Sequence, residues 1–475
     1  MMEEEIKLEV GKTLKLDITS YTHEGLGVGK YSGKNLDLNL ENYPFFIFGA
    51  ILGDTVLAEI TSLNKSYGYA TIVKTIEANN KDSRVTPICP AYKLCGGCNI
   101  MHMSYKEQLH FKEEMVKSTI KKFSGVNEFK QLPIIPSQNI YYYRNKVQVP
   151  VISFLNKTKC GFYERSSHKV VPLDKCFIQT EKSTNLVNFV KNIFVELGVK
   201  GYNELYDNGN LKHILIRKNH DESEMMVVAV VKDLSFLNEE FKERLIDKII
   251  KRYPEVVSIS INYNPKNTNT ILGNTSITIY GNNYITDTLC GMKFKIGIES
   301  FYQINHDQTE ILYNTAIKIA DLNKDDIVID AYSGIGTIGL IISKAVKEVY
   351  SVEIVKEAID NAEENKKMNN VKNIHFVCNK AEDQIALWLN EGIKVSTIIV
   401  DPPRKGCDEK LLNSIIEHKI NKLIYISCNP STLARDIGVL SKNNYELKIV
   451  QPVDLFPHTN HIECISSLVL RNISS

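Results

Sequence analysis

The carboxyl-terminal part of the chain alternates short apolar runs with stretches of helical composition. Six runs rich in β-branched residues recur there, the first five spaced by roughly 20 to 27 residues. They cover residues 327–331, 349–353, 374–377, 397–401, 423–427 and 464–470. Runs this short and apolar are typical of buried strands, and the length between them suits one crossover helix. The pattern therefore predicts βαβ units in a doubly wound α/β sheet.

The whole chain is long enough for several domains. It has 475 residues, of which 43% are hydrophobic, and this suits about two to four domains with sizeable cores. We expect a barrel domain over residues 1–78 and a central α+β domain over residues 79–295. The sheet domain would then cover residues 296–475.

Charge and hydropathy limit the location and the partners of the protein. The net charge is +1, so any nucleic-acid binding must come from local basic patches. No apolar run approaches the roughly 20 residues of a membrane span. The chain starts with Met-Met-Glu-Glu-Glu. This start is acidic, whereas a signal peptide starts with a basic stretch that an apolar one follows. We expect a cytoplasmic monomer without membrane contact, whose ten cysteines are reduced or bound to metal.

Residues 6 to about 75 have the pattern of a small β-barrel. Short runs such as 14–18 and 55–60 alternate apolar with polar residues, and glycine-rich turns such as 25–29 separate them. Several short strands with glycine turns are typical of a closed barrel. The segment therefore predicts an OB-like fold.

Aromatic residues near the end of this barrel suggest a partner. Lys65, Tyr67 and Tyr69 interleave charge with rings, which suits an RNA backbone and stacked bases. Ordinary strand packing explains the same residues. The order of short motifs resembles that of the TRAM domain, an RNA-binding module, and this favours RNA; the motifs are Gly25-Leu26-Gly27-Val28, Phe45-Phe46-Ile47, Gly53-Asp54 and Tyr67-Gly68-Tyr69-Ala70.

Three cysteines fall within ten residues after the barrel. Cys89, Cys95 and Cys98 surround two glycines, and this spacing in a cytosolic protein indicates an iron–sulfur or other metal centre. A fourth ligand is needed, for which Cys176 and Cys160 are the nearest candidates. Zinc is the competing interpretation, because thiolates also bind zinc.

Two motifs follow neighbouring predicted strands of the sheet. The first is Asp401-Pro402-Pro403-Arg404-Lys405-Gly406, and the second is Ser427-Cys428-Asn429-Pro430. Carboxyl ends of parallel strands meet at one edge of a sheet, where open α/β sheets bind ligands. The sequence therefore predicts a site that contains an aspartate and a cysteine. Arg404 and Lys405 could face phosphates there or be ordinary surface charge.

A glycine-rich turn marks a cofactor site. The segment from Asp330 to Gly339 follows the first strand, and Glu353 ends the second strand 19 residues after Gly334, where it could bind ribose hydroxyls. A nicotinamide cofactor is the competing interpretation. Three features favour S-adenosylmethionine: Asp330 at the strand end could meet a cationic ligand, Asp-Pro-Pro has no role in hydride transfer, and a cysteine site suits methyl transfer to carbon. The arrangement resembles a class I methyltransferase core.

A cysteine is useful when a methyl group must reach carbon 5 of a pyrimidine. A thiolate that adds to carbon 6 makes carbon 5 nucleophilic, and a base must later remove the carbon 5 proton. Cys428 is the thiol candidate, because a helix start after it would lower the thiol pKa. Glu463 is the carboxylate candidate, since it leads into an apolar strand. Cys407 and Cys464 are rival thiols without comparable context.

The motifs together resemble the RNA uracil-5-methyltransferase family over nearly the whole chain. They are Asp-Ala-Tyr-Ser-Gly-Ile-Gly, Asp-Pro-Pro-Arg-Lys-Gly, Ser-Cys-Asn-Pro and His-Ile-Glu-Cys, in that order. The resemblance implies a class I (Rossmann-like) methyltransferase domain, with Cys428 as nucleophile and Glu463 as proton acceptor. It implies that the cofactor is bound by four residues, the last of them also near the target base: Gln303, Tyr332, Glu353 and Asp401. Phe301 matches a family aromatic near the base.

The cysteine cluster matches the branch of this family that carries a 4Fe-4S cluster. The resemblance implies four ligands: Cys89, Cys95, Cys98 and Cys176. That branch acts on large-subunit (23S) ribosomal RNA, which is therefore the expected partner. Two alternatives stay open. One is methylation of transfer RNA uridine, and the other is a non-catalytic RNA-binding iron–sulfur protein.

Overall fold

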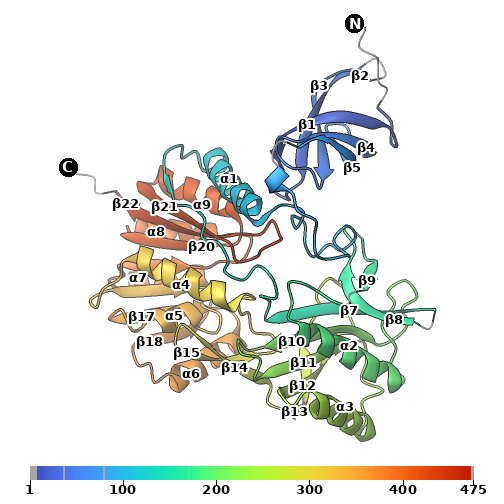
Figure 1. The fold of residues 1–475 in the computed structure, drawn as a ribbon. Coiled ribbons are helices and arrows are strands. Elements are labelled where there is room, and N and C mark those ends of the chain that lie inside the picture. The colour runs from blue at the N-terminus through green and yellow to red at the C-terminus, as the bar shows by residue number, and fades with distance from the viewer. Residues whose placement is uncertain are drawn as a thin grey trace. The chain divides into compact units, whose positions relative to one another are not determined.

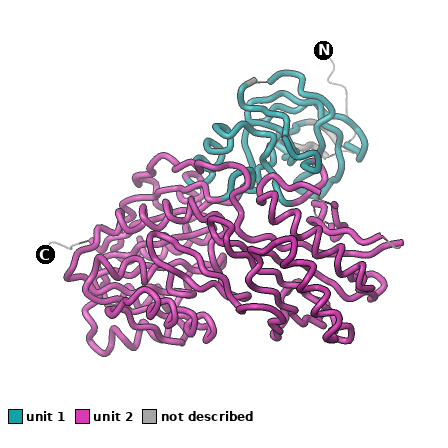
Figure 2. Tube along the Cα trace, turned by 60° about the horizontal axis from the view of Figure 1, so that its bottom comes forward, with its two compact units in different colours: residues 1–92, 97–116, 456–460 teal, residues 93–96, 117–455, 461–475 magenta. Residues whose placement is uncertain are grey.

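The chain forms two compact units, each described here by itself. The computed structural model describes residues 8–471, apart from residues 36–37, 79–80, 156, 166 and 173 (Figure 1). Unit 1 contains residues 1–92, 97–116 and 456–460, and unit 2 contains residues 93–96, 117–455 and 461–475 (Figure 2). No helix among the described residues is long and apolar enough to cross a membrane.

Unit 1 contains a closed five-stranded barrel, as predicted. Its strands follow the order β1-β2-β3-β5-β4; they are β1 (Thr13–Tyr21), β2 (Gly27–Asn35), β3 (Leu38–Phe48), β4 (Thr55–Leu63) and β5 (Gly68–Glu77). Every second residue of β1 faces the interior, where Leu14, Leu16 and Ile18 are buried, because side chains alternate along a strand. Residues 1–7 of the predicted barrel domain lie outside the described residues.

Two helical segments follow the barrel. They are the short 3₁₀ helix η1 (Lys81–Ser83) and the helix α1 (Tyr105–Ser124). The first part of α1 belongs to unit 1, where Gln108 accepts a hydrogen bond of 2.8 Å from the backbone N–H of His458. A polar contact thus joins α1 to a segment 350 residues later in the chain.

The central part of unit 2 is an α+β domain around a seven-stranded sheet. The strand order is β13-β12-β11-β10-β7-β8-β9; the strands are β7 (Lys146–Phe154), β8 (Lys157–Tyr163), β9 (Val170–Pro172), β10 (Leu211–Lys218), β11 (Met225–Val231), β12 (Val256–Tyr263) and β13 (Thr275–Gly281). Helices α2 (Glu181–Glu196) and α3 (Glu239–Arg252) share one apolar cluster with these strands. β11 and β12 are parallel and the other pairs are antiparallel.

The carboxyl-terminal part of unit 2 is built on an eight-stranded sheet of order β18-β17-β16-β19-β20-β22-β21-β6. Its strands are β6 (Lys130–Gln131), β16 (Ile327–Ala331), β17 (Glu348–Glu353), β18 (Ile374–Cys378), β19 (Thr397–Val400), β20 (Lys422–Ser427), β21 (Tyr445–Val453) and β22 (Glu463–Leu470). The first five in spatial order are parallel, and β22 is antiparallel to both neighbours. This is a doubly wound α/β sheet, as predicted.

Six helices and a hairpin complete this part of unit 2. They are α4 (His306–Ala320), α5 (Thr337–Ile342), α6 (Lys356–Met368), α7 (Ala381–Asn390), α8 (Glu409–Glu417) and α9 (Pro430–Lys442), with the hairpin β14 (Tyr284–Leu289) and β15 (Met292–Gly297). Ile285 and Phe294 of the hairpin belong to the same apolar cluster as Val328 and Ile424 of the sheet. The hairpin therefore packs with the sheet that follows it.

The six predicted strands of this sheet are all present, each within one residue of its expected bounds. The sequence did not predict β21. That strand contains Pro452, which pairs with Cys464 of β22, and proline is unusual inside a sheet because it has no N–H to donate. Its other neighbour is the two-residue β6, so β21 lies close to an open edge where proline is tolerated.

Gly339 allows α5 to pack against β16, and its replacement should destabilise unit 2. An added Cβ would lie 2.7 Å from Asp330 Oδ2 and 2.7 Å from Ser351 Oγ. Overpacking of this kind costs about 1–3 kcal/mol, whereas alanine gains about 1 kcal/mol over glycine in a helix. We expect Gly339→Ala to lower the midpoint of thermal unfolding by several degrees in differential scanning fluorimetry. An unchanged or raised midpoint would show that Asp330 moves aside freely.

Candidate active site

The strand order brings three predicted residues to one edge of the sheet. β16 is the central strand, and its last residue, Ala331, pairs with Val352 of β17 and Val400 of β19. Each paired residue is followed along the chain by a predicted site residue: Ala331 by Tyr332, Val352 by Glu353 and Val400 by Asp401. They therefore share the carboxyl edge at the point where the strand order reverses, which is where open α/β sheets bind ligands.

The glycine-rich turn between β16 and α5 is held by Glu353. Its Oε2 accepts a hydrogen bond of 3.1 Å from Gly334 N, and its Oε1 accepts one of 2.9 Å from Val355 N. Tyr332, Gly334 and Gly336 have φ of 64°, 55° and 81°, a left-handed backbone that favours glycine. The tyrosine in this strained position has a pKa raised chiefly by burial. Glu353 thus orders the turn in addition to facing the predicted cofactor site.

Asp330 has a different place from the one predicted. It lies inside β16, fully buried, rather than at the strand end. Its Oδ2 accepts hydrogen bonds from Gly339 N at 2.9 Å and Ser351 Oγ at 3.4 Å, and its Oδ1 has no hydrogen-bond partner. Burial raises the pKa of Asp330 to about 7. One oxygen of this carboxyl group therefore anchors α5 to the sheet, and contact of Asp330 with a cationic ligand stays a prediction.

The segment before α4 carries Phe301 and Gln303. Phe301 is 69% exposed, whereas Gln303 is buried. Asn145 Nδ2 donates to the backbone oxygen of Gln303 at 2.9 Å, and Arg217 Nη2 donates to that of Ser300 at 2.8 Å. Fully buried Arg217 therefore clamps the segment to the central sheet. The segment therefore carries an exposed aromatic ring, and a ring of this kind can stack on an RNA base.

The pairing of β20 with β22 brings Cys428 and Glu463 together. Ser427 pairs with Cys464 in antiparallel register, so the residue after Ser427 lies across from the residue before Cys464. Cys428 is partly exposed and Glu463 is 2% exposed. Glu463 Oε2 has no hydrogen-bond partner. A partly exposed thiol thus lies across the strand pair from a buried carboxyl group.

The thiol pKa of Cys428 is raised, not lowered. Burial, Glu463 and Asp401 together raise this pKa to about 11, against an opposite effect of Arg404. The sequence analysis expected the start of α9 to lower it. That helix does begin at Pro430, but two carboxyl groups and partial burial outweigh its dipole. Forming the thiolate therefore requires a nearby proton acceptor.

Two carboxyl groups of the site have raised pKa values. Burial raises the pKa of Asp401 to about 7. The pKa of Glu463 is raised well above its usual range by burial and by Asp401, against a smaller opposite effect of Arg404. Asp401 is half-buried and Glu463 is buried, and two carboxyl groups that lie near each other in such surroundings cannot both ionise readily. Acids and bases tuned in this way are typical of catalytic sites.

Tyr313 also lies near these carboxyl groups, although no sequence motif points to it. Its fully buried hydroxyl, on α4, lies near Asp401 and Glu463; burial and Asp401 raise its pKa, while a hydrogen bond with Thr337 lowers it. No motif surrounds Tyr313, because it lies in an ordinary amphipathic helix. Only the packing of α4 against β20 and β22 brings it to the carboxyl groups.

The rival thiols are less suited to act as nucleophiles. Cys407 and Cys464 are buried, at 5% and 0% exposed, and burial raises the pKa of each. The backbone N–H of Cys407 donates to Asp436 Oδ2 at 2.9 Å, so this residue is part of a buried polar contact. Of these three thiols, Cys428 is the one that is partly exposed to solvent and also lies near the carboxyl groups of the site.

The predicted metal ligands are divided between the units. Cys95 and Cys176 belong to unit 2, whereas Cys89 and Cys98 belong to unit 1. The pKa of Cys176 is raised to about 11 by burial and slightly by Cys95, while backbone N–H groups of residues 178 and 179 lower it. Amide hydrogen bonds to sulfur suit a cluster ligand. Cys160, the other candidate, lies in the apolar core of the central sheet and donates to Asn188 Oδ1.

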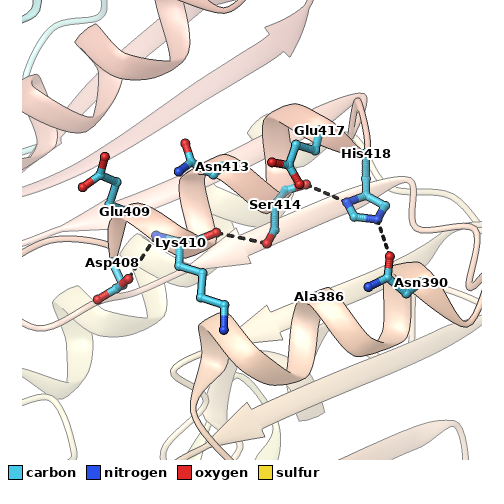
Figure 3. A pocket seen from close by; sticks show the side chains of 9 residues that line it. All are labelled: Ala386, Asn390, Asp408, Glu409, Lys410, Asn413, Ser414, Glu417 and His418. Atoms are coloured by element: carbon cyan, nitrogen blue, oxygen red, sulfur yellow. Dashed lines mark hydrogen bonds between the residues drawn. The ribbon is translucent and has the colours of Figure 1, made fainter.

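A surface hollow of about 590 Å³ lies between α7 and α8 (Figure 3). Its lining is polar, with His418 Nε2 and Asn390 Oδ1 3.1 Å apart. Lys410 forms an ion pair with Asp383 beside it. None of the predicted site residues lines this hollow, so we do not include the hollow in the site.

Comparison with known proteins agrees with this geometry. The family profile described as tRNA (uracil-5-)-methyltransferase matches residues 273–471. The chain is 39% identical to an uncharacterized RNA methyltransferase of Halalkalibacterium halodurans, covering 99% of this chain and 100% of that one. It is 41% identical to another from Listeria innocua, covering 98% and 99%. A solved Pyrococcus abyssi tRNA (uracil-54, C5)-methyltransferase with S-adenosyl-L-homocysteine is similar in fold, with TM-score 0.74, 24% identity and coverage of 96% and 100%.

The raised pKa of Asp401 should make stability depend on pH. Its folded pKa of about 7 exceeds the ordinary 3.8, so the folded protein holds a proton that the unfolded chain releases. The contribution of Asp401 to stability therefore falls as pH rises from about 4 to 7, by up to about 4 kcal/mol. We expect Asp401→Asn to raise the thermal unfolding midpoint by more at pH 8 than at pH 5.

The control for this variant is Asp383→Asn, which alters an exposed carboxylate that pairs with Lys410. Its midpoint should change little at either pH, because exposed ion pairs contribute little to stability. A midpoint difference for Asp401→Asn that is the same at pH 5 and pH 8 would contradict the raised pKa.

Proposed function

The chain belongs to the RNA uracil-5-methyltransferase family, and on that premise we propose that it methylates carbon 5 of uridine in large-subunit (23S) ribosomal RNA. The family establishes an S-adenosylmethionine-dependent RNA methyltransferase. One observation carries the finer proposal: an accessible thiol, Cys428, lies across the β20–β22 register from the buried carboxyl of Glu463. This pair of groups is needed for carbon 5 chemistry and has no use in methylating oxygen or nitrogen.

The cofactor would lie over the glycine-rich turn. Four residues would hold it: Gln303, Tyr332, Glu353 and Asp401. These residues lie at or next to the carboxyl edge of the sheet, where ligands bind. The turn has a left-handed backbone, so the backbone of the turn is open to a ligand. When bound, S-adenosylmethionine supplies an electrophilic methyl group on a cationic sulfur.

Thiolate formation comes first. A proton passes from Cys428, whose pKa is about 11, to a carboxylate such as that of Asp401, whose pKa is about 7. A gap of about four pKa units costs about 5 kcal/mol, which is small beside the barriers that enzymes lower. The same carboxyl groups that raise the thiol pKa therefore also provide its proton acceptor.

The remaining steps use both faces of the uracil ring. The Cys428 sulfur adds to carbon 6, and the electron pair of the carbon 5–carbon 6 bond moves to carbon 5 and its carbonyl. Carbon 5 would then take the methyl group, whose bond to the cofactor sulfur breaks and leaves its electron pair on that sulfur. Glu463 removes the carbon 5 proton, and the carbon–sulfur bond breaks to restore the double bond and the thiolate. Because a stacked base hides both faces, the uridine must be flipped out of its RNA, and exposed Phe301 is available to stack on it.

In this proposal, four cysteines would hold a 4Fe-4S cluster: Cys89, Cys95, Cys98 and Cys176. The amide groups near the sulfur of Cys176 and its electrostatic contact with Cys95 suit thiolate ligands. The cluster has no part in the methyl transfer steps above. We infer that it orders the polypeptide or positions the RNA.

The barrel offers one surface for that RNA. Phe46 stacks on Tyr67 with ring centroids 5.3 Å apart, and Tyr69 lies edge-on to both rings. Tyr69 is 38% exposed. Rings that reach the surface next to lysine, here Lys65, suit base stacking and phosphate contact.

A second candidate substrate is transfer RNA. The matching family profile is described by its action on tRNA, whereas the cysteine cluster resembles the branch that acts on ribosomal RNA. The chemistry at Cys428 and Glu463 is the same for both, so the two candidates differ only in the RNA that the protein binds.

Glu463→Gln should trap the reaction after methyl transfer. The amide keeps the shape of the side chain but cannot take the carbon 5 proton, so the carbon–sulfur bond to Cys428 cannot break. We expect a covalent protein–RNA adduct that carries the labelled methyl group and survives denaturing electrophoresis. It should form with unmodified transcripts of large-subunit ribosomal RNA and not with transfer RNA.

The matched control is the double variant Cys428→Ala with Glu463→Gln, which should form no adduct. An adduct with transfer RNA alone would keep the chemistry and overturn the proposed substrate. The absence of any adduct, in a preparation whose wild type methylates RNA, would contradict the role of Glu463.

A further inference from the structure

Three positive side chains gather next to the segment that carries Phe301 and Gln303. They are Arg144, Lys146 of β7 and Arg217 of β10, all in unit 2. Lys146 pairs directly with Arg217 in the antiparallel register of the two strands, so their side chains lie on one face of the sheet. Burial, Arg217 and Arg144 lower the pKa of Lys146 to about 8. All three charges are therefore close together.

The face that carries these charges is turned toward the carboxyl-terminal sheet. Leu215 of β10 belongs to the apolar cluster of that sheet, whereas Ile214 and Ile216 belong to the cluster that contains α2 and α3. Arg217 lies two residues after Leu215 and faces the same way, because side chains alternate along a strand. Lys146, directly opposite Arg217, shares this face. The charges thus lie between the central sheet and the predicted active site.

The segment before α4 is bound to the same charged strip. Arg217 Nη2 donates to the backbone oxygen of Ser300 at 2.8 Å. Arg144 forms an isolated β-bridge with Asn305. Between these two points Phe301 is 69% exposed. A nucleotide whose base stacks on Phe301 would therefore have its backbone near the three cations.

Within the described part of the chain, no carboxylate forms an ion pair with any of these three side chains. Apart from burial, the groups that act on the pKa of Lys146 and Arg217 are two arginines and Tyr302. The Nε atoms of Arg144 and Arg217 have no hydrogen-bond partner, although Arg217 is only 2% exposed. Like charges directly opposite each other destabilise a strand pair, and buried charges are normally paired. The strip therefore lacks an anion that the chain itself does not supply.

We propose that Lys146, flanked by Arg144 and Arg217, binds a phosphate group of the substrate RNA beside the flipped uridine. This inference rests on the proposed function, which supplies the RNA. Lysine and arginine are the side chains that most often contact phosphate, and such contacts fix the position of a nucleic acid without reading its sequence. Half-buried Lys146 would thus hold the backbone of the nucleotide while its base is out of the stack.

The test compares wild type with Lys146→Met and Lys146→Arg, with Lys212→Met as the matched control. Lys212 is a buried lysine of β10 whose Nζ donates to the backbone oxygens of Asn264 and Lys266, so its contacts are made within the chain. Filter binding over a range of salt concentrations would measure affinity for unmodified transcripts of large-subunit ribosomal RNA and transfer RNA. The thermal unfolding midpoint would be measured in inorganic phosphate and in chloride of the same ionic strength.

We expect Lys146→Met to weaken RNA binding about tenfold and to reduce the slope of log affinity against log salt by about 0.7–0.9, the change for one lost phosphate contact. Lys146→Arg and Lys212→Met should keep the wild-type affinity and slope. In chloride, Lys146→Met should unfold at a higher temperature than wild type, because one of two facing like charges is removed. Phosphate should raise the midpoint of wild type by more than that of Lys146→Met.

Unchanged RNA affinity and salt slope in Lys146→Met, folded by circular dichroism, would overturn the proposal. If phosphate then stabilised wild type alone, the strip would be a site for free phosphate. Equal losses of affinity in Lys146→Met and Lys212→Met would overturn it too, because they would reflect total charge only. None of these measurements needs turnover. A protein that binds RNA through Lys146 but transfers no methyl group would therefore contradict the proposed function and support this inference.

Discussion

The site depends on two carboxyl groups, those of Asp401 and Glu463, held in electrostatic contact inside the protein. Burial raises the pKa of both, and each disfavours the ionised form of the other. Such an arrangement costs stability, because water would solvate either charge better. The site therefore contains a carboxyl group with a pKa of about 7, that of Asp401, near the thiol of Cys428, which would lose a proton in the proposed reaction. The carboxyl groups that raise the pKa of Cys428 are also the groups that could accept its proton.

Strand register is what holds these groups in place. The parallel strands β16, β17 and β19 bring Tyr332, Glu353 and Asp401 to one edge, and the antiparallel β22 brings Glu463 opposite Cys428. A shift of one residue in β22 would turn Glu463 to the other face of the sheet. The pairing of β22 with β21 along eight residue pairs opposes such a shift. Catalytic geometry therefore depends on a strand that the sequence analysis missed.

Local patterns predicted most of the sheet and the candidate residues, whereas effects between distant segments were not predictable. Six of the strands between Ile327 and Leu470 follow from short apolar runs, whereas β21 does not, and the motifs around Cys428 and Glu463 lie at strand ends. The direction of the Cys428 pKa depends on charges brought from three strands, and Asp330 turned out to anchor a helix. Tyr313 carries no local signal, because only tertiary packing brings it to its partners. The four-cysteine ligand set and the ribosomal substrate stay predictions.

Identification of the methylated nucleoside tests the central claim most directly. Labelled S-adenosylmethionine would be supplied to wild type and Cys428→Ala with unmodified transcripts of large-subunit ribosomal RNA and transfer RNA, and the products digested for nucleoside mass spectrometry. We predict 5-methyluridine in ribosomal RNA from the wild type and none from the variant, because carbon 5 reacts only after the thiolate adds to carbon 6. A methyl group on another atom, or 5-methyluridine made by Cys428→Ala at the wild-type rate, would contradict the account.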